Sequence, residues 1–327
     1  MNVPELDVFL DRTGLVKQEV PRQLTPLTGG VSSDIWRVEV SDGRTLCVKR
    51  ALAKLKVAAD WQAPVSRNAY EWAWIEFAGS VVPQAVPRPL AHDESLGMFA
   101  MGYLDPTSHP VWKQQLLAGR VDAGVAGQVG RVVGRLHQAS AHRPDLAQRF
   151  DTGANFHALR LEPYLLATAS RHPELASALH ALVHRTAHHR TALVHGDVSP
   201  KNILVGPQGP VLLDAECAWY GDPAFDVAFC LNHLLLKQVV VPHCRAELQT
   251  AFEAWVTGYF ESVEFESRAQ LEQRCAQLLP ALMLARVDGK SPVEYITGEQ
   301  DRERIRAFAI SRLISPPDQL RDLSLAW

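Results

Sequence analysis

The residues best suited to chemistry lie in one short stretch, 195–205, and in a strand-like run that ends at Asp214. The stretch reads HGDVSPKNILV, and VLLD follows at 211–214. Asp197 can orient a hydroxyl group and accept its proton, because an alcohol is a poor nucleophile without a nearby base. Asn202 and Asp214 supply an amide oxygen and a carboxylate, which are ligands that Mg2+ prefers. The order and spacing predict phosphoryl transfer from ATP with Mg2+.

Each of these residues also has an ordinary structural use. A single Asp or Asn after a strand usually forms a turn, but three of them in this order are typical of kinase chemistry. For His195 we expect a structural role, in which the ring holds the loop by hydrogen bonds, rather than a role as a base. Lys201 is open to two interpretations, a second positive charge at the site or a solvated surface lysine.

Lys49 is the candidate for contacting the ATP phosphates. It ends the strand-like run 46–49, where its aliphatic stem can pack on a sheet while the ammonium group reaches phosphate oxygens. Many lysines at strand ends are simply solvated, so this interpretation depends on a partner. Glu71, on the helix expected at 66–79, is the proposed ion-pair partner, and Glu76 could take its place.

A glycine-rich turn before Lys49 is a second candidate for phosphate contacts. Gly29 and Gly30 lack side chains, so backbone amides there can approach phosphate oxygens, and Ser32 and Ser33 could donate further hydrogen bonds. A plain hairpin turn explains two glycines equally well.

The run 98–104 is the candidate for binding the adenine base. It is expected to be the strand that joins the two halves of the chain. The backbone groups of its last three residues, Gly102, Tyr103 and Leu104, could pair with the adenine edge, and a buried strand is the alternative.

The first third of the chain shows the apolar–polar alternation of strands. Strands are expected at 24–27, 35–40, 45–49, 87–92 and 98–104. One main helix, with Ser66 as its N-cap, is expected at 66–79. This predicts a small N-terminal lobe, residues 1–104, built on an antiparallel sheet and binding ATP.

Helical periodicity dominates beyond the turn at Asp105 and Pro106. Helices are expected at 121–141, 154–168, 173–189, 223–237, 246–263, 267–287 and 299–313. The exception is 192–214, where short β-like runs at 193–194, 203–205 and 211–213 flank the Asp197 motif, with a hairpin turn at 207–210. The sequence therefore predicts an α+β protein whose larger, mainly helical lobe, residues 105–327, carries the catalytic and acceptor-binding residues.

Composition excludes several classes of function. The 327 residues include 33 Lys plus Arg and 36 Asp plus Glu, a formal charge of -3, and no basic block suited to nucleic acid. The five cysteines show no paired spacing, which is typical of a reducing compartment. The first residues lack the order of a signal peptide, and no apolar run reaches the length of about 20 residues that spans a bilayer. We therefore expect a cytoplasmic protein without nucleic-acid or membrane partners, and we assign no oligomeric state.

The chain resembles the aminoglycoside phosphotransferase and choline kinase group, which shares the bilobal protein-kinase-like fold. The similarity covers roughly 24–237 and is most specific in HGDVSPKN and LLDAECAWYGDPAFDVAF. It implies that Asp197 is the catalytic base, that Asn202 and Asp214 bind Mg2+, that Lys49 holds the ATP phosphates, and that Asp226 braces the catalytic loop. It also implies a small acceptor with a hydroxyl group, either a sugar-like metabolite or an amino alcohol.

Within this group, two stretches are most similar to 5-methylthioribose kinases. They are VKRAL at 48–52, followed by Trp61 and Glu71, and ECAWYG at 216–221, followed by Phe225 and Asp226. The glycine-rich turn and the catalytic loop depart from that family's usual GDGNLN and HGDLHTGS forms. An aminoglycoside antibiotic is a further alternative acceptor, although a cationic antibiotic would require a dense acidic cleft and no compact acidic cluster lies near the motif.

Other kinase functions fit the sequence less well. Eleven residues separate Asp214 from Asp226, which leaves no room for the activation segment of a protein kinase, and no APE motif follows. Ser199 also stands where protein kinases carry a catalytic-loop lysine. A pseudokinase that only binds nucleotide would be expected to have lost one of the four central residues, and all four are present: Lys49, Asp197, Asn202 and Asp214.

The acceptor is expected to bind near Asp197 in the helical lobe. Candidate contacts are Glu216, Trp219 and Tyr220, which follow the Asp214 strand, and Arg286, farther along the chain. Each also has an ordinary interpretation as a core or helix-surface residue, and a fold resemblance alone cannot name a substrate.

Overall fold

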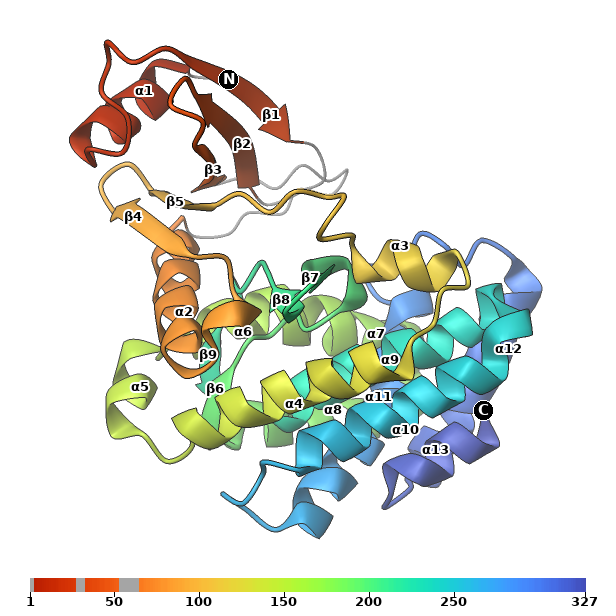
Figure 1. The fold of residues 1–327 in the computed structure, drawn as a ribbon. Coiled ribbons are helices and arrows are strands. Elements are labelled where there is room, and N and C mark those ends of the chain that lie inside the picture. Colours follow the sequence, from red (N-terminus) through yellow and green to blue (C-terminus); the bar gives the residue numbers. More distant parts are fainter. Residues whose placement is uncertain (1–2, 28–32, 53–64) are drawn as a thin grey trace. The chain divides into compact units, whose positions relative to one another are not determined.

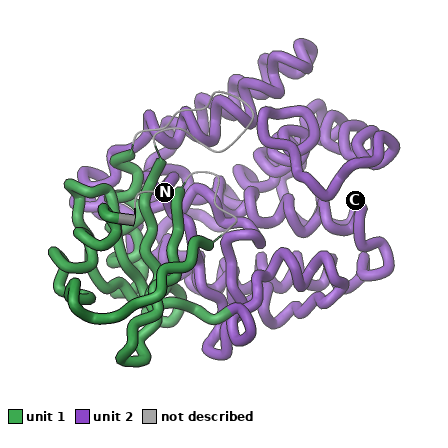
Figure 2. The backbone as a smooth tube through the Cα atoms, turned by 90° about the horizontal axis from the view of Figure 1, so that it is seen from above, with its two compact units in different colours: residues 1–105 green, residues 106–327 purple. Residues whose placement is uncertain are grey.

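The computed structural model describes residues 3–27, 33–52 and 65–327, and the chain divides into two compact units (Figure 2). One unit is Met1–Asp105 and the other is Pro106–Trp327. Within the described ranges, no helix combines the length and the apolar character needed to cross a bilayer.

The N-terminal unit is built on a five-stranded antiparallel sheet with the order β1-β2-β3-β5-β4 (Figure 1). Its strands are β1 (Arg22–Leu27), β2 (Ser33–Val40), β3 (Thr45–Ala51), β4 (Pro89–Asp93) and β5 (Met98–Gly102). Alternate side chains of β2 and β3, such as Trp36, Val38 and Val48, enter the core. Strand β5 ends at Gly102, so Tyr103 and Leu104 follow the strand instead of belonging to it.

Two helices accompany this sheet. Helix α1 (Val3–Arg12) is absent from the sequence-based prediction, and it buries Leu6, Phe9 and Leu10 in the core cluster of the sheet. Helix α2 (Arg67–Val81) is the predicted helix, and its residue Glu71 is buried. Ser66 precedes α2, but its side chain makes no capping hydrogen bond.

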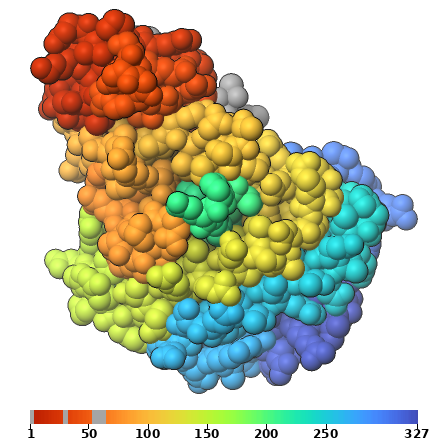
Figure 3. Space-filling model, in the orientation of Figure 1, coloured from red at the N-terminus to blue at the C-terminus, as the bar shows by residue number. Residues whose placement is uncertain are grey.

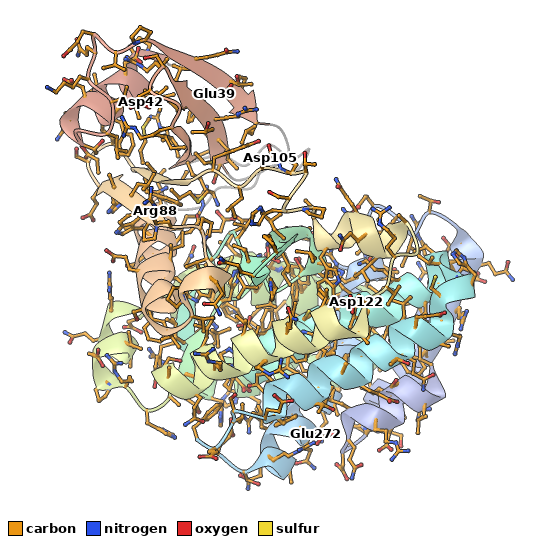
Figure 4. The ribbon with its side chains drawn as sticks, in the orientation of Figure 1. Glu39, Asp42, Arg88, Asp105, Asp122 and Glu272 are labelled. Atoms are coloured by element: carbon orange, nitrogen blue, oxygen red, sulfur yellow. The ribbon has the colours of Figure 1, made fainter. Side chains whose placement is uncertain are left out.

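Helices make up most of the C-terminal unit (Figure 1). They are α3 (Trp112–Leu117), α4 (Ala123–Ser140), α5 (Pro144–Arg149), α6 (Gly153–Phe156), α7 (Ala167–Arg171), α8 (Ala176–His188), α9 (Ala224–Val240), α10 (Arg245–Phe260), α11 (Arg268–Asp288), α12 (Glu299–Ile314) and α13 (Leu320–Ala326). Asp122, labelled in Figure 4, caps α4 by accepting a hydrogen bond of 2.7 Å from the amide of Gly124.

The predicted single helix at 154–168 is instead divided into three parts. A π-helical segment, His157–Leu166, lies between α6 and α7 and contains Pro163. Proline has no amide hydrogen and its ring collides with the preceding turn, so an α-helix cannot run unchanged through this position.

Helices α4 and α10 approach closely because two glycines lie at their contact. A Cβ atom at Gly130 would lie 2.1 Å from the carbonyl oxygen of Trp255, and one at Gly134 would lie 2.4 Å from that of Tyr259. No other residue fits at either position without moving a backbone. The contact fixes the side of α4 that carries His137 relative to α10.

Two pairs of short strands position the Asp197 motif. Strand β6 (Ala192–Val194) pairs with β9 (Trp219–Gly221), and β7 (Ile203–Gly206) pairs with β8 (Gly209–Leu212). The β7–β8 hairpin is the green segment in Figure 3, and its turn consists of the exposed residues Pro207 and Gln208. This turn is shorter than the predicted turn at 207–210 because Gly209 already pairs with Gly206. Strand β9 is absent from the sequence-based prediction. The loop that carries Asp197 therefore starts directly after β6, and Asp214 follows the end of β8.

Candidate active site

Asp197 is a buried carboxylate that two cations hold at one oxygen. Its Oδ2 lies 2.8 Å from Nη2 of Arg160 and 3.2 Å from Nζ of Lys201, while Oγ of Ser199 is 3.4 Å from its Oδ1. Burial alone would raise the pKa of Asp197, but the charges of Lys201 and Arg160 outweigh it and lower this pKa below its ordinary value. Asp197 is therefore anionic at neutral pH, with Oδ1 the less occupied oxygen.

Arg160 is the main site residue that the sequence does not reveal. It belongs to the π-helical segment His157–Leu166, and its side chain is 8% exposed. Its Nε also donates a hydrogen bond of 2.6 Å to the carbonyl oxygen of Gly196. A charged residue within the apolar run ALRLEPYLL is the signal that could have drawn attention to it, because a buried arginine needs a partner.

The backbone of the loop is held by Asp226 at the start of α9. The carboxylate of Asp226 accepts hydrogen bonds of 2.8 Å from the amides of both His195 and Gly196. Nε2 of His137 lies 3.2 Å from the same carboxylate, and Nδ1 of His137 lies 2.9 Å from the hydroxyl oxygen of Tyr259. A side-chain network from α4 and α10 thus reaches the loop through one carboxylate.

The ring of His195 completes this arrangement. Its Nδ1 accepts a hydrogen bond of 3.1 Å from the amide of Asp197, which assigns the ring proton to Nε2. Burial lowers the pKa of His195, so the ring is neutral at physiological pH. The hydrogen bond and the neutral ring support the expected structural role of His195.

Two hydrogen bonds connect the segments that carry Asp197, Asn202 and Asp214. Nδ2 of Asn202 donates to the carbonyl oxygen of Asp197 at 3.2 Å, so its amide oxygen is the atom left for a cation. The amide of Leu213 donates to the carbonyl oxygen of Asn202 at 2.9 Å, which joins the end of β8 to the loop. Asp214 has a φ of 69°, a left-handed conformation that is uncommon outside glycine and frequent at functional sites.

The donor set at this point fits a hard cation that keeps other oxygen ligands. Within the described ranges, no group of three or more His, Cys, Asp or Glu side chains is placed to hold a metal ion. One amide oxygen and one carboxylate are instead suited to Mg2+, which retains water or phosphate oxygens in its shell.

Some candidates of the N-terminal unit lie among the described residues, and others do not. Nζ of Lys49 lies 2.7 Å from Oε1 of Glu71, and both side chains are about 4% exposed or less. Ser33 is buried at the start of β2, and Tyr103 lies under the guanidinium of Arg37. Gly29, Gly30 and Ser32 fall outside the described residues. Their predicted phosphate contacts stay predictions, as do that of Ser33 and the adenine contacts of Gly102, Tyr103 and Leu104.

Two of the predicted acceptor contacts are core residues. Trp219 is 2% exposed and stacks on Phe156 with ring centroids 4.3 Å apart. The hydroxyl of Tyr220 donates to the carbonyl oxygen of Thr191 at 2.7 Å and accepts from the amide of Arg143. Both belong to β9, whose pairing with β6 buries them. Their contact with a substrate stays a prediction.

The other two predicted contacts lie in different surroundings. Glu216 is 8% exposed, and its carbonyl oxygen accepts a hydrogen bond of 3.1 Å from Nδ2 of Asn155. Arg286 is also 8% exposed and donates from Nη1 to the hydroxyl oxygen of Tyr164 at 2.9 Å. Since the guanidinium of Arg160 lies 5.9 Å from the ring of Tyr164, Arg286 is connected to the surroundings of Asp197 through this tyrosine.

Comparisons with known sequences point to one family. The model of the phosphotransferase enzyme family matches residues 23–265. A methylthioribose kinase of Escherichia coli O45:K1 is 26% identical over 72% of this chain and 66% of its own length. Methylthioribose kinase 1 of Oryza sativa subsp. japonica is 23% identical over 68% of this chain and 59% of its own length. The matched part of the chain thus spans less than two thirds of the length of these relatives.

Solved structures agree with the predicted fold. A choline kinase from Cryptosporidium parvum is 10% identical with a TM-score of 0.60, covering 99% of this chain and all of the other. A putative fructosamine-3-kinase from Thermobifida fusca is 21% identical with a TM-score of 0.53, covering 94% and 98%. An amicoumacin kinase in complex with AMP-PNP and Ca2+ is 16% identical with a TM-score of 0.52, covering 93% and 92%. These likenesses confirm the α+β kinase-like fold, and the family match over most of the sequence establishes that the chain belongs to the phosphotransferase enzyme family.

Proposed function

We propose that this protein transfers the γ-phosphoryl group of ATP to a hydroxyl group of a small molecule. The observation that carries the proposal is the placement of Asp197, a buried carboxylate whose Oδ2 lies within ion-pair distance of Arg160 and Lys201. Family membership and the kinase-like fold support the same reaction. The short interval between Asp214 and Asp226 supports a small acceptor over a peptide.

In this proposal, Asp197 orients the acceptor hydroxyl and takes its proton at Oδ1. The hydroxyl oxygen forms the new bond to the γ-phosphorus as the bond to the β,γ-bridging oxygen breaks, and ADP leaves with that oxygen. Because the transition state is loose, the proton moves late, and a carboxylate of low pKa is sufficient. Arg160 and Lys201 keep the carboxylate in place while this happens.

We propose that Asn202 and Asp214 hold the metal ion and that Lys49, fixed by Glu71, binds the ATP phosphates. The amide oxygen and carboxylate described above fit Mg2+, which supplies charge neutralisation at the phosphate oxygens when bound. The complex of the amicoumacin kinase with AMP-PNP and Ca2+ supports a nucleotide and a divalent cation. The five cysteines are free and buried, which fits a reducing compartment, and we propose the cytoplasm.

Replacement of Asp197 by Asn tests the proposal. We expect phosphoryl transfer to fall by about 100-fold to 10,000-fold, while calorimetry shows unchanged binding of ATP. Asp145→Asn is the control, because Asp145 is an exposed carboxylate of the same unit and lies in α5. Undiminished transfer by the Asp197→Asn enzyme would refute the assignment of the base.

Methylthioribose is the specific acceptor that sequence similarity favours, because relatives at 23–27% identity are methylthioribose kinases. A coupled assay of ATP consumption with methylthioribose, other sugars, amino alcohols and aminoglycosides tests it. Turnover of about 1 to 100 per second would mark the physiological acceptor. If methylthioribose gives no turnover while another acceptor does, this candidate is excluded and the general proposal stands.

A further inference from the structure

The second half of α9 carries a buried lysine amine for which the described residues supply no counter-ion. Lys237 is fully buried, and its one hydrogen bond among the described residues is a long one of 3.4 Å from Nζ to the carbonyl oxygen of His233. No carboxylate in the described ranges forms an ion pair with it. Burial is the main reason that its pKa is lowered to about 7. A lysine at such a depth is costly to charge without a partner and is rarely kept for stability.

A second buried cation with unused donors lies nearby on α11. Arg286 donates to Tyr164 and Ser291 through Nη1, but its buried Nε has no hydrogen-bond partner within the described part of the chain. The Nε edge of a guanidinium is suited to bind both oxygens of a carboxylate. Ring contacts bring Arg286 to the face of α9 that carries Lys237. The guanidinium of Arg286 lies 5.4 Å from the ring of Tyr164, and this ring is 5.5 Å from that of Phe229 on α9.

Polar residues near these cations do not neutralise them. Nδ1 of His233 lies 3.2 Å from the hydroxyl oxygen of Tyr295, and burial together with the charges of Lys237 and Arg286 keeps the pKa of His233 well below its usual value. Glu294 is the carboxylate that acts on Lys237, and it already forms an ion pair with Lys113. The group as a whole therefore offers positive charge and neutral donors to a ligand.

The group is connected to the catalytic loop along one face of α9. Phe229, His233 and Lys237 are spaced by four residues, so their side chains follow one another on this face. The guanidinium of Arg160, which binds Asp197, lies 5.8 Å from the ring of Phe229. Because the helix rises 1.5 Å per residue, Lys237 lies about 12 Å along the axis from Phe229.

We propose that Lys237 and Arg286 bind a carboxylate of the phosphate acceptor, so that the acceptor is a small hydroxy acid. This inference rests on the proposed function and specifies its substrate class. A cationic acceptor such as an amino alcohol or an aminoglycoside would be repelled by the two cations, and a neutral sugar would leave them unpaired. The ring of Tyr295 lies against Nζ of Lys237, with its centroid 4.9 Å away, and is partly exposed, so displacement of this ring would admit the carboxylate.

Thermal unfolding with matched ligands tests the site without requiring catalysis. Each ligand series consists of an acid, its amide and a related amine: gluconate, gluconamide and glucosamine in one series, and glycerate, glyceramide and serinol in the other. Each ligand is added to wild type, Lys237→Met and Lys290→Met at equal ionic strength. Lys290→Met is the control, because Lys290 is exposed and loses the same charge. We expect the acids to raise the Tm of wild type and of the control but not that of Lys237→Met. Without ligand, Lys237→Met should be at least as stable as wild type.

Three outcomes of this experiment would overturn the inference. They are a failure of both acids to raise the Tm of wild type, an equal rise in Lys237→Met, and a larger rise with the amines than with the acids. If the acids raise the Tm but no acceptor is phosphorylated, the carboxylate site stands and the proposed kinase activity fails.

Kinetics provide the second measurement. We expect a higher kcat/KM for a hydroxy acid than for its amide or amine, and we expect Lys237→Met to raise the KM for the acid by about 30-fold or more with a smaller change in kcat. Arg286→Lys, which keeps the charge and loses the planar edge, should retain part of the preference for acids. Efficient transfer to methylthioribose with no preference for acids would leave the kinase activity intact and contradict the inference.

Discussion

Arg160 and Asp197 form a buried ion pair, with Nη2 of the arginine 2.8 Å from Oδ2 of the aspartate. The same guanidinium donates to the carbonyl oxygen of Gly196, so one side chain fixes both the carboxylate and the backbone beside it. Lys201 contacts the same oxygen but is half exposed, and its contribution is screened by solvent. Arg160 is thus the cation best placed to set the proton affinity of Asp197.

Replacing Arg160 by Met should change the pH dependence of transfer. Burial raises the pKa of Asp197, whereas the charges of Lys201 and Arg160 lower it. Removal of Arg160 should therefore raise the pKa of Asp197. The base acts when deprotonated, so activity is present above its pKa and is lost as the pH falls through it. The acidic limb of the kcat/KM profile should therefore move to higher pH, and less so in Arg160→Lys. An acidic limb that stays in place in Arg160→Met would contradict this account.

Replacement of Asp214 should separate stability from activity. Asp214 has a φ of 69°, so Asp214→Gly relieves backbone strain in the folded state but raises the conformational entropy of the unfolded state. Because these effects oppose each other, the free energy of unfolding should stay within about 1 kcal/mol of wild type. Asp214→Val should be less stable than Asp214→Gly, because a β-branched residue tolerates this conformation poorly. Transfer should fall by about 100-fold or more in both variants. Urea unfolding and a magnesium titration of activity are the measurements, and a fully active Asp214→Gly enzyme would exclude Asp214 as a metal ligand.

The ion pair between Lys49 and Glu71 should be strongly coupled. Lys49→Met leaves a buried carboxylate without its cation, and we expect a loss of about 3 to 5 kcal/mol in the free energy of unfolding. The double variant Lys49→Met, Glu71→Leu should recover much of this loss, because no unpaired charge remains. Denaturant unfolding of the single and double variants forms a double-mutant cycle. Simple additivity of the two single changes would show that the pair is not coupled.

A methyl group at Gly196 should disrupt the catalytic loop. Gly196 has a φ of 79°, and a Cβ atom there would lie 2.7 Å from the carbonyl oxygen of Cys217. Gly43→Ala is the matched control, since Gly43 has a φ of 89° and open space around it. Both changes should cost about 1 to 2 kcal/mol for the backbone conformation, and Gly196→Ala should cost about 1 to 3 kcal/mol more and lower transfer. Equal losses of stability would show that the collision is relieved at no cost.

Local patterns in the sequence predict much of the fold and the centre of the site. Alternation in β2 and helical periodicity in α4 and α10 reflect burial of one face, which neighbouring residues determine. Asn202 precedes β7 and Asp214 follows β8, and these two strands form a hairpin. Both residues could therefore be placed near Asp197. Helix α1 was also predictable, since Leu6, Phe9 and Leu10 have the spacing of one helical face.

Contacts between distant segments could not be predicted in this way. Arg160 precedes Asp197 by 37 residues and reaches it from a π-helical segment, and nothing in its neighbours specifies that geometry. The pairing of β9 with β6 likewise depends on tertiary contacts, so the burial of the aromatic residues that follow Asp214 could not be predicted. Lys237 looks like an ordinary residue near a helix end until its burial is known.

A single helix carries both the anchor of the catalytic loop and the buried ammonium. Asp226 and Lys237 are eleven residues apart on α9, which corresponds to about 16 Å along the axis. A helix of this length does not shorten or extend, so the separation of these two points is invariant. An acceptor whose carboxylate met Lys237 while its hydroxyl met Asp197 in this loop would be selected, in the transfer step, by the number of bonds between the two groups. Acids of different length that bind at Lys237 would then be phosphorylated at different rates.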